Sequence, residues 1–423
     1  MNAWFPLLAY QCTMLPLVWS SWARSQYLSD MEDMSRTGHG IVLFSALASL
    51  YLYARLFLFS SERGEIRFPR LVAQSVPFLV LLVVTPPLLS KDLYGYGILA
   101  WSTWWGRINP YLTPMAQVSP HPWLPLPGDP FWLHEVTPYG PLSVLFSWLP
   151  LLLSRGNLLV FAAIYKGLMT GGFVAALLWV DRLQPAFPNG SRQAMASLPV
   201  LLLCNPVILV NGVLEGHNEL LLVSLLVLLL CFLARGHHPA AVASLGVAAA
   251  VKVSVAPLLP VLWFRSGRFS LFRAVASTCT VALLFVCAFA PFSFALRGAW
   301  EGRVMQSSLY CFYVCSPVTY LFDQIAPQYA AVGGRLLGVV LVLAAAWVFL
   351  VRSHSPILFG ALALCALFLT AVRFLTPWYF LPPLTLMAVA SRSATVNRVG
   401  VLLISVYSFS LYVKLWGTVA PFR

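Results

Sequence analysis

The chain has 423 residues, of which 60% are hydrophobic and only 9% are charged, whereas soluble domains contain about 25% charged residues. Its mean hydropathy of +0.82 excludes an ordinary soluble fold and predicts many membrane segments, which must satisfy their backbone polar groups within helices. The net charge of +13 does not indicate nucleic-acid binding, because the basic residues lie mostly in short loops and do not alternate with stacking aromatics.

The long apolar segments predict an all-α polytopic membrane protein that forms one domain over residues 1–423. Their hydrophobic residues do not alternate strictly, which favours helices over a barrel. No internal repeat and no soluble domain interrupts them. We expect about 11–13 membrane helices, each of about 20 residues, with these spans: 3–21, 40–60, 70–90, 157–180, 197–214, 220–234, 272–292, 333–351, 356–372, 375–391 and 398–418.

The arginines orient these helices. Segment 55–70 carries four arginines and segment 264–273 carries three, so the positive-inside rule predicts that both are cytoplasmic. The loop 91–138 has only Lys91 and Arg107 as basic residues. This loop and the second loop, 293–332, are therefore predicted to be extracytoplasmic.

The apolar stretch 239–263 cannot be one simple span, because basic residues at both ends, Arg235 and Arg265, predict that both ends are cytoplasmic. We expect a pair of short helices that turns near Lys252, buried in the protein where it lines a polar cavity. The stretch 140–154 is similarly predicted to be a partly inserted helix of the outer loop.

Asp92 begins the first outer loop, directly after an apolar span. A carboxylate at such a position is costly unless it is paired or functional, and it suits a general base that accepts a proton from a hydroxyl. Pairing with Lys91 is the alternative. The rest of the loop is rich in Trp, Pro and Tyr, which predicts interfacial helices that cap a cavity.

A second polar cluster runs from Asn211 to Glu219 between two apolar helices. The threading places His217 and Asn218 in the same compartment as Asp92, which predicts a shared site, although a solvated turn is the alternative. Three cations are the third feature of the predicted site: Lys166, Lys252 and Arg373 lie in or beside apolar stretches. Buried cations need an anionic partner, and a lipid phosphate would provide one; snorkelling to the interface is the alternative.

Short motifs recur in order from about residue 90 to 383. They comprise Asp92, Tyr94 and Tyr96; Gly106, Arg107, Asn109, Pro110 and Tyr111; Pro138 to Pro141 with Tyr139; Asn211, Gly212, Gly216, His217, Asn218 and Glu219; Lys252 ahead of Pro257 and Pro260; and Arg373, Pro377, Trp378 and Tyr379. This ordered set resembles the polyprenol-phosphate-sugar-dependent glycosyltransferases of the GT-C fold, and more narrowly the bacterial α-(1→6)-mannosyltransferases of lipoglycan synthesis. Glu219 departs from that family, which has Asp there.

The resemblance implies a GT-C-like bundle and an inverting transfer of a sugar, expected to be mannose. The donor would be a polyprenyl phosphate sugar, and the acceptor a hydroxyl of a lipid-linked or free glycan at the periplasmic face of a bacterial plasma membrane. It implies no metal or other cofactor. The predicted catalytic base is Asp92. The predicted donor-phosphate ligands are Lys252, Arg373, His217 and Lys166, and the predicted substrate-binding residues are Tyr94, Tyr96, Arg107, Asn109, Tyr111, Tyr139, Asn218, Glu219, Trp378 and Tyr379.

Three other functions fit parts of the pattern. A transporter or flippase of a lipid-linked sugar would also have buried cations and broken helices, but the chain lacks an internal repeat and has a large aromatic outer loop. In a non-catalytic subunit of a membrane complex Asp92 would be dispensable. An enzyme of the O-antigen-ligase type, which uses a diphosphate donor, would not need a carboxylate at that helix end.

Overall fold

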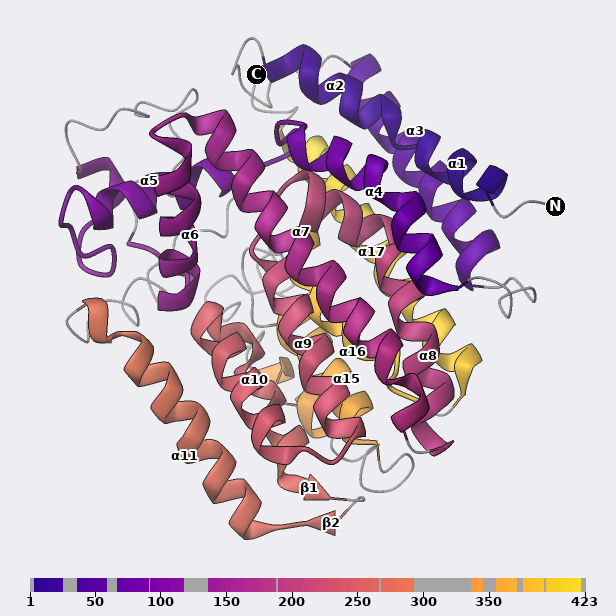
Figure 1. Ribbon diagram of the computed structural model, residues 1–423, viewed down its shortest axis with the longest axis vertical. Helices are drawn as coiled ribbons and strands as arrows, with labels where there is room; N and C mark the ends of the chain where they lie inside the picture. Colours follow the sequence, from indigo (N-terminus) through magenta and orange to yellow (C-terminus); the bar gives the residue numbers. More distant parts are fainter. Residues whose placement is uncertain are drawn as a thin grey trace.

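A computed structural model describes the following residues (Figure 1): 4–25, 36–58, 67–90, 92–117, 136–187, 189–265, 268–292, 336–338, 340–344, 355–370, 376–391 and 393–419. The predicted loop 293–332 and Arg373 lie outside these ranges, as does most of the predicted span 333–351. Within the described part, all regular structure is helical except two paired two-residue strands, β1 (Phe264–Arg265) and β2 (Arg268–Phe269).

The helices before the first strand are bounded as follows: α1 Trp4–Cys12, α2 Leu15–Ser25, α3 Arg36–Tyr53, η2 Ala54–Leu58, α4 Phe68–Val84, α5 Asp92–Trp104, η4 Met115–Gln117, α6 Pro141–Ser154, α7 Leu158–Leu183, η6 Gln184–Ala186, α8 Asn189–Leu203, η7 Ile208–Leu214, α9 Glu219–Ala234, α10 His238–Val251 and η8 Val253–Trp263. After the strands come α11 Leu271–Ala288, η9 Ala290–Phe292, α15 Pro356–Thr370, η13 Pro377–Phe380, α16 Leu381–Met387 and α17 Ala394–Val419.

The described part of the chain has the helices of a polytopic membrane protein. Three are long and apolar enough to cross a bilayer, namely Leu158–Ala186, Leu271–Ala288 and Ala394–Leu411, and α8 with η7 makes a fourth if this bent pair is one span. Seven shorter apolar helices accompany them. Their total neither reaches nor excludes the predicted 11–13 spans, because parts of the chain lie outside the described residues.

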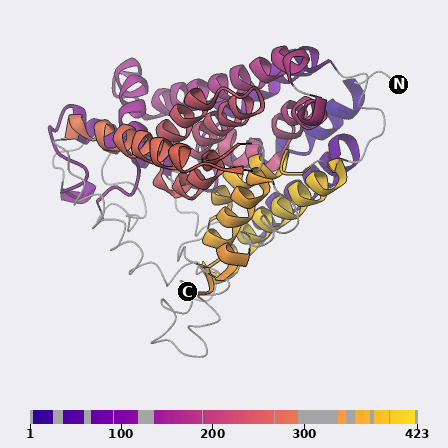
Figure 2. The same ribbon diagram turned by 90° about the horizontal axis from the view of Figure 1, so that it is seen from below.

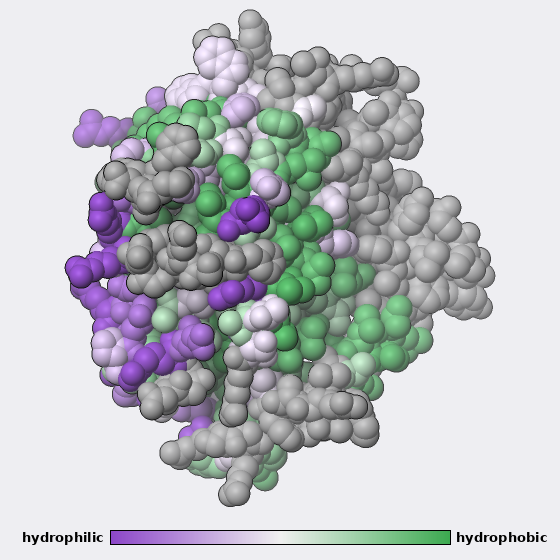
Figure 3. Space-filling view, turned by 90° about the vertical axis from the view of Figure 1, so that its right-hand side faces the viewer, coloured by the Kyte–Doolittle hydropathy of each residue, from purple (hydrophilic) through white to green (hydrophobic). Residues whose placement is uncertain are grey.

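The molecular surface fits a lipid environment. Large apolar side chains stand exposed, with Phe272 at 81% and Trp19 at 76% exposure, whereas soluble monomers rarely present large continuous apolar areas to water. Figure 3 shows a broad hydrophobic area beside a narrower hydrophilic zone at one edge. A bilayer would cover such an area, so the apolar residues are arranged for lipid contact as well as for the core.

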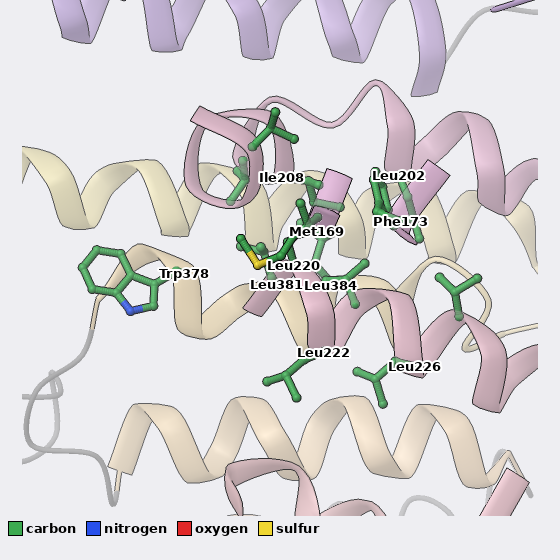
Figure 4. Packing of buried hydrophobic residues seen from close by; sticks show 14 of the residues in the cluster. Met169, Phe173, Leu202, Ile208, Leu220, Leu222, Leu226, Trp378, Leu381 and Leu384 are labelled. Carbon is green, nitrogen blue, oxygen red and sulfur yellow. The ribbon is translucent and has the colours of Figure 1, made fainter. Parts of the chain in front are cut away.

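The core lies where α7, α9 and α16 meet η7, and it holds buried aliphatic and aromatic side chains such as Phe173, Leu220 and Leu384 (Figure 4). The C-terminal helices α15 and α17 lie along one side of the layer that contains α7 and α9 (Figure 2). Because lipid tails are as apolar as leucine, close van der Waals packing holds such helices together. Gly246 on α10 permits this, since a Cβ there would stand 2.5 Å from Leu284 of α11.

The predicted pair of short helices in 239–263 is confirmed. α10 ends at Val251, Lys252 is extended with φ −155°, and η8 returns as a 3₁₀ helix. Fourteen residues of α-helix and eleven of 3₁₀ helix have nearly the same length, about 21 Å and about 22 Å at 1.5 and 2.0 Å per residue. The His238 ring therefore meets the Leu262 carbonyl, with Nε2 at 2.8 Å from the oxygen. Both ends lie together, and Lys252 is buried at the tip.

Several predicted spans are not continuous helices: the span 3–21 is divided between α1 and α2 at residues 13–14, and two later spans are also broken. The predicted span 197–214 bends by 61° between α8 and η7. Pro206 has no N–H for the helix ladder, and the Asn205 side chain instead accepts from the N–H groups of Val207 and Ile208 at 2.9 and 3.3 Å. The predicted span 375–391 contains the one-turn η13 followed by the seven-residue α16, both largely buried. Neither break changes the apolar composition, which is why composition alone did not reveal them.

Candidate active site

Asp92 is the first residue of α5, and its side chain is 19% exposed. Pro86 and Pro87 stop α4 before it, since proline cannot donate to a helix ladder. The Asp92 N–H bonds the Ser90 hydroxyl at 3.1 Å, which starts the new helix. A carboxylate in a first helical turn is favoured by the helix dipole, so the acid stabilises α5 while its oxygens stay accessible.

The polar cluster that ends at Glu219 is buried, which excludes the solvated turn. Glu215, His217 and Asn218 have 0% exposure. Gly216 adopts φ +72°, and a Cβ there would stand 2.8 Å from the Lys166 side chain. Only glycine tolerates both this backbone conformation and the close contact with Lys166. The turn can therefore place the polar side chains on either side of Gly216 in the protein interior.

His217 connects this turn to Asp92. Its Nδ1 lies 3.6 Å from the Asp92 Oδ2, and the Tyr139 hydroxyl donates to the same oxygen at 3.4 Å. One face of the imidazole ring stacks on Trp378, with ring centroids 3.7 Å apart and an angle of 18° between the ring planes. Trp378 lies at one end of the hydrophobic core (Figure 4). Side chains from α5, the loop before α6, the turn before α9 and η13 therefore meet here.

Lys252 completes the cluster from the tip of the α10–η8 pair. Its ammonium forms a hydrogen-bonded ion pair with Glu219. The same nitrogen lies 4.2 Å from the ring centroid of Tyr379 and 5.9 Å from that of Tyr139, distances at which an aromatic face attracts a cation. A lipid phosphate was predicted as the anionic partner of this cation, and within the protein Glu219 takes that position.

Several buried polar atoms of the cluster have no hydrogen-bond partner among the described residues. They are Nε2 and Nδ1 of His217, Oδ1 of Asn218 and Oε2 of Glu219. The Asn218 amide still donates to the Ser143 hydroxyl at 3.0 Å. Buried polar groups are nearly always satisfied in native proteins, so these atoms are suited to a polar ligand such as a sugar.

The pKa values of Asp92 and His217 shift in opposite directions. Burial raises the pKa of Asp92 to about 6, and the neighbouring Glu219 carboxylate adds to the rise, while Lys252 and the Tyr139 hydrogen bond oppose it. Burial, aided by Lys252, lowers the pKa of His217 well below its ordinary value. Near neutral pH the site therefore holds an ionised Asp92 beside a neutral His217.

Two residues hold the segment between α4 and Asp92 in place. Glu215 accepts hydrogen bonds from three consecutive N–H groups, those of Leu88, Leu89 and Ser90, at 3.0, 2.8 and 2.9 Å. A carboxylate that accepts three amide protons fixes the segment directly before Asp92. Glu215 belongs to the predicted polar cluster, but its sequence position did not predict this supporting role.

Lys166, from the middle of α7, acts on the carbonyl groups of the same region. Its ammonium donates to the carbonyls of Leu82, Thr85 and Leu214, the first and last at 3.0 Å. All three ammonium protons are thus used within the protein, and the side chain has 0% exposure. The geometry gives Lys166 a structural role in place of the predicted donor-phosphate contact. We call Glu215 and Lys166 together the Asp92 clamp.

The remaining predicted residues of the outer loop divide between two places. Tyr94 and Tyr96 are buried on α5, and the Tyr96 ring meets Tyr139 edge-on at 5.0 Å beside Asp92. Arg107 lies beyond the opposite end of α5, which has 13 residues and is therefore about 20 Å long. The structure does not bring Arg107 to Asp92.

Asn109 and Tyr111 build the loop beyond α5. The Asn109 amide donates to the Phe292 carbonyl at 2.8 Å, and its oxygen accepts from the Tyr111 N–H at 3.0 Å. The Tyr111 hydroxyl donates to the Tyr139 carbonyl at 3.0 Å. Both side chains thus hold this loop together, and their contact with substrate stays a prediction.

Among the described residues, no group of three His, Cys, Asp or Glu side chains could hold a metal ion. The donor atoms that converge on the site are instead one carboxylate, one imidazole, one ion pair and several aromatic hydroxyls, a set suited to binding a polyhydroxylated ligand and moving a proton.

The chain is similar to known proteins over part of its length. The chain is 29% identical over 197 residues to an alpha-(1->6)-mannopyranosyltransferase A of Corynebacterium glutamicum, covering 46% of this chain and 39% of that protein. It is 28% identical over 284 residues to the protein of that name in Mycobacterium tuberculosis, covering 63% of this chain and 53% of that protein. The chain thus spans about half or less of the length of these curated relatives. No solved structure matches it. The sequence model described as "Alpha-(1->6)-mannopyranosyltransferase, N-terminal domain" matches residues 7–267, more than half of the chain. The predicted resemblance is therefore confirmed, and the chain belongs to the alpha-(1->6)-mannopyranosyltransferase family.

Proposed function

We propose that this protein transfers mannose from a polyprenyl-phosphate donor to a hydroxyl of a glycan or lipid-linked acceptor, with Asp92 as the general base. The observation that carries the proposal is the convergence on Asp92 of His217, Tyr139 and the Lys252–Glu219 pair from separate elements. The names of both relatives support mannose as the sugar and an α-(1→6) linkage as the product.

Asp92 would take the proton of the acceptor hydroxyl as its oxygen attacks the anomeric carbon. A pKa of about 6 keeps the carboxylate ionised at neutral pH and still basic, which is the compromise that general bases need. His217, neutral and held flat against Trp378, would orient the carboxylate oxygen nearest to it. The proton moves from the hydroxyl to Asp92, and the electrons of the broken glycosidic bond leave with the donor phosphate.

One free carboxylate favours a single displacement with inversion. Retaining glycosidases use a second carboxylate as a nucleophile about 5 Å from the first, and the same double displacement here would need such a group. Glu219 is the other acid of this site, but its carboxylate is engaged with the Lys252 ammonium. It is therefore poorly placed to form a covalent glycosyl intermediate, and the proposed reaction has none.

The donor phosphate would lie on the Lys252 side of the site. Asp92, Glu219 and Lys252 carry charges of −1, −1 and +1, so the trio has a net charge of −1 and an anionic donor needs a further cation. Arg373, four residues before Pro377, is proposed for this role. Such cations would stabilise the charge that grows on the leaving phosphate.

The sugar rings would be held by the aromatic and unpaired polar groups around Asp92. Trp378, Tyr379 and Tyr139 provide faces and hydroxyls, and the free oxygens of Asn218 and Glu219 can accept from sugar hydroxyls. Holding the attacking hydroxyl and the anomeric carbon in line provides much of the rate enhancement. We propose a GT-C-like architecture in which this site opens to the periplasmic side, as the arginine distribution of the loops predicts.

Transfer by purified protein in detergent tests the proposal. Wild type, Asp92→Asn and Asp181→Asn would be incubated with polyprenyl-phosphate-[¹⁴C]mannose and an α-(1→6)-linked mannose acceptor. Asp181 is a partly exposed acid near the end of α7 and controls for loss of a carboxylate. We expect Asp92→Asn to lose roughly 10²–10⁴-fold in kcat and Asp181→Asn to resemble wild type. Full activity of Asp92→Asn removes it as the base. If the wild type transfers no mannose but moves the donor lipid across vesicle membranes, the protein is a flippase and the proposed function is wrong.

A further inference from the structure

A pocket of about 570 Å³ lies beyond the C-terminal end of α5, away from Asp92. Its lining includes Trp104 at the end of α5, Trp105 and Arg107 directly after that helix, and Trp148 from α6. In Figure 1 this is the region at the left where α5 and α6 approach the upper end of α11. The volume is within the range of about 300–1,000 Å³ that is typical of small-molecule sites.

The pocket presents aromatic faces and a free cation. Trp104 and Trp105 are 40% and 48% exposed, although these large side chains normally gain most by burial. The exposed Arg107 has no acidic partner among the described residues. It also has φ +54°, a left-handed conformation usually left to glycine at helix ends. The chain therefore holds a long cationic side chain where glycine would be less strained.

The base of the pocket is preformed. Tyr111, Val144, Phe289 and Phe292 make a separate hydrophobic cluster beneath it, against which Trp148 packs. The Trp148 indole N–H donates to the Thr103 hydroxyl at 2.8 Å. Trp104 meets Trp148 edge-on at 4.8 Å between ring centroids. Side chains fixed in this way lose little entropy when a ligand binds.

This lining suits a carbohydrate. Indole faces bind the apolar C–H faces of sugar rings, and the five N–H donors of a guanidinium suit sugar hydroxyls. A purely apolar ligand would leave Arg107 unpaired. Among the described residues Arg107 is the only cation in the lining, so a multiply charged anion would be poorly neutralised. None of the described lining residues is a carboxylate, so a neutral glycan suits them.

We propose that this pocket binds sugar units of the acceptor glycan that lie several residues away from the hydroxyl receiving mannose. The inference rests on the proposed function. The α5 helix of 13 residues separates the pocket from Asp92 by about 20 Å, so one extended oligosaccharide can occupy both places while a disaccharide at Asp92 cannot. Remote binding of this kind raises affinity for long acceptors without changing the reacting centre.

The test measures KM and kcat against acceptor length, using α-(1→6)-linked mannose oligosaccharides from disaccharide to octasaccharide. The pocket variants are Trp105→Ala and Arg107→Asn, because asparagine tolerates the left-handed conformation. Trp19→Ala, which removes a tryptophan that is 76% exposed on α2, is the matched control.

For the wild type and Trp19→Ala, we expect KM to fall as the acceptor lengthens. Each pocket variant should raise KM for the octasaccharide by about fivefold to tenfold, the effect of truncating one anchor side chain, and leave the disaccharide kinetics unchanged. Equal effects on both acceptors, or a wild-type KM independent of length, would overturn the proposal. Variants that instead alter only the dependence on anionic lipid in nanodiscs would assign the pocket to a lipid headgroup.

Failure of the proposed function is distinguishable from failure of this inference. If the wild type transfers mannose to no acceptor, the mannosyltransferase proposal fails. Binding of the octasaccharide, followed by calorimetry with wild type and Trp105→Ala, then still tests the pocket: equal affinities overturn it, and weaker binding by the variant supports it.

Discussion

Asp92 differs from an ordinary surface carboxylate because three neighbours control its proton affinity. Glu219 raises its pKa together with burial, whereas Lys252 and the Tyr139 hydroxyl lower it. The fully buried His217 stays neutral because burial and Lys252 both disfavour its charge. Asp92 is therefore expected to titrate at about pH 6, and a pH profile of activity tests its role directly.

The pH profile of kcat/KM should have an acid limb near pH 6. Asp92 must be ionised to act as a base, so activity rises through its pKa of about 6 and is then constant, with a tenfold loss per pH unit below it. Glu219→Gln removes a negative neighbour and should move the limb to lower pH, whereas Lys252→Met removes a positive one and should move it to higher pH. Shifts in the reverse directions, or no shift in either variant, would contradict the assignment.

At the scale of elements, the Asp92 clamp compensates for a segment that cannot form regular structure. Two consecutive prolines interrupt the chain after α4, yet the segment is buried, so its N–H and C=O groups need other partners. Glu215 accepts hydrogen bonds from three N–H groups of this segment, and Lys166 donates to the Thr85 carbonyl at its start and to two carbonyls beside it. The opposite charges of the two side chains also offset each other's burial. The position of Asp92 therefore depends on residues that do not touch substrate.

Removing either half of the clamp should displace Asp92. For Glu215→Gln and Lys166→Met we expect at least tenfold lower kcat, little change in donor KM, and a loss of about 1–3 kcal/mol of stability for each buried group left unsatisfied. The double variant should cost less than the sum of the single variants, because both act on one segment. Thermal unfolding with kinetics in the same detergent provides the measurement. Unchanged kcat in both single variants would separate the clamp from catalysis.

The turn before α6 and the tip of the α10–η8 pair form a second contact between elements. The Gly140 N–H donates to the Val251 carbonyl at 2.9 Å. A Cβ at Gly140 would stand 2.2 Å from the Ala250 carbonyl oxygen. Any larger residue must push Tyr139 and Lys252 apart, which links a glycine with no reactive group to the geometry of the site.

Gly140→Ala should therefore lower activity, with an overpacking cost of about 1–3 kcal/mol. Gly171→Ala is the matched control, because nothing lies within 4 Å of a Cβ there and alanine favours a helix interior by up to about 1 kcal/mol. We expect transfer by Gly140→Ala to fall at least tenfold while Gly171→Ala keeps full activity and equal or higher thermal stability. Equal activity of the two variants would show that the contact is not needed.

At the scale of the whole molecule, the arginine distribution predicts which ends face the cytoplasm. The loop between α9 and α10 and the paired strands β1 and β2 lie on one side, because the two ends of the α10–η8 pair meet at His238 and Leu262. The positive-inside rule assigns that side to the cytoplasm. The C-terminal end of α5, which Arg107 follows, is then predicted to face the opposite compartment.

Cysteine labelling checks this topology. In a background with all eight native cysteines replaced by alanine, His237→Cys and Phe269→Cys should react with an impermeant maleimide only after the membrane is opened. Arg107→Cys should react from outside the cell. All three positions are exposed, so accessibility within the protein does not differ between them. Labelling of Arg107→Cys and His237→Cys from the same side would contradict the predicted arrangement.

Composition and motifs alone predict the membrane class and the family, and they single out residues for a site. Lipid demands long apolar helices, so composition identified them, and the isolated polar residues between them were conspicuous for the same reason. Asp92, His217, Asn218, Glu219 and Lys252 stood out in this way, whereas Tyr139, Trp378 and Tyr379 were predicted from the family resemblance. The described structure gathers these residues.

The pairing of these residues, and which side chains hold others in position, depend on how the helices pack in three dimensions. Glu219 lies 33 residues from Lys252, and Glu215 lies 125 to 127 residues from the amides that it holds, separations at which local patterns carry no information. Lys166 lies in an apolar stretch, as a buried ligand of a lipid phosphate would, yet its ammonium donates hydrogen bonds to three backbone carbonyls. The physical reason is that backbone groups in a buried, proline-broken segment must be satisfied, and which side chain reaches them depends on how the helices pack.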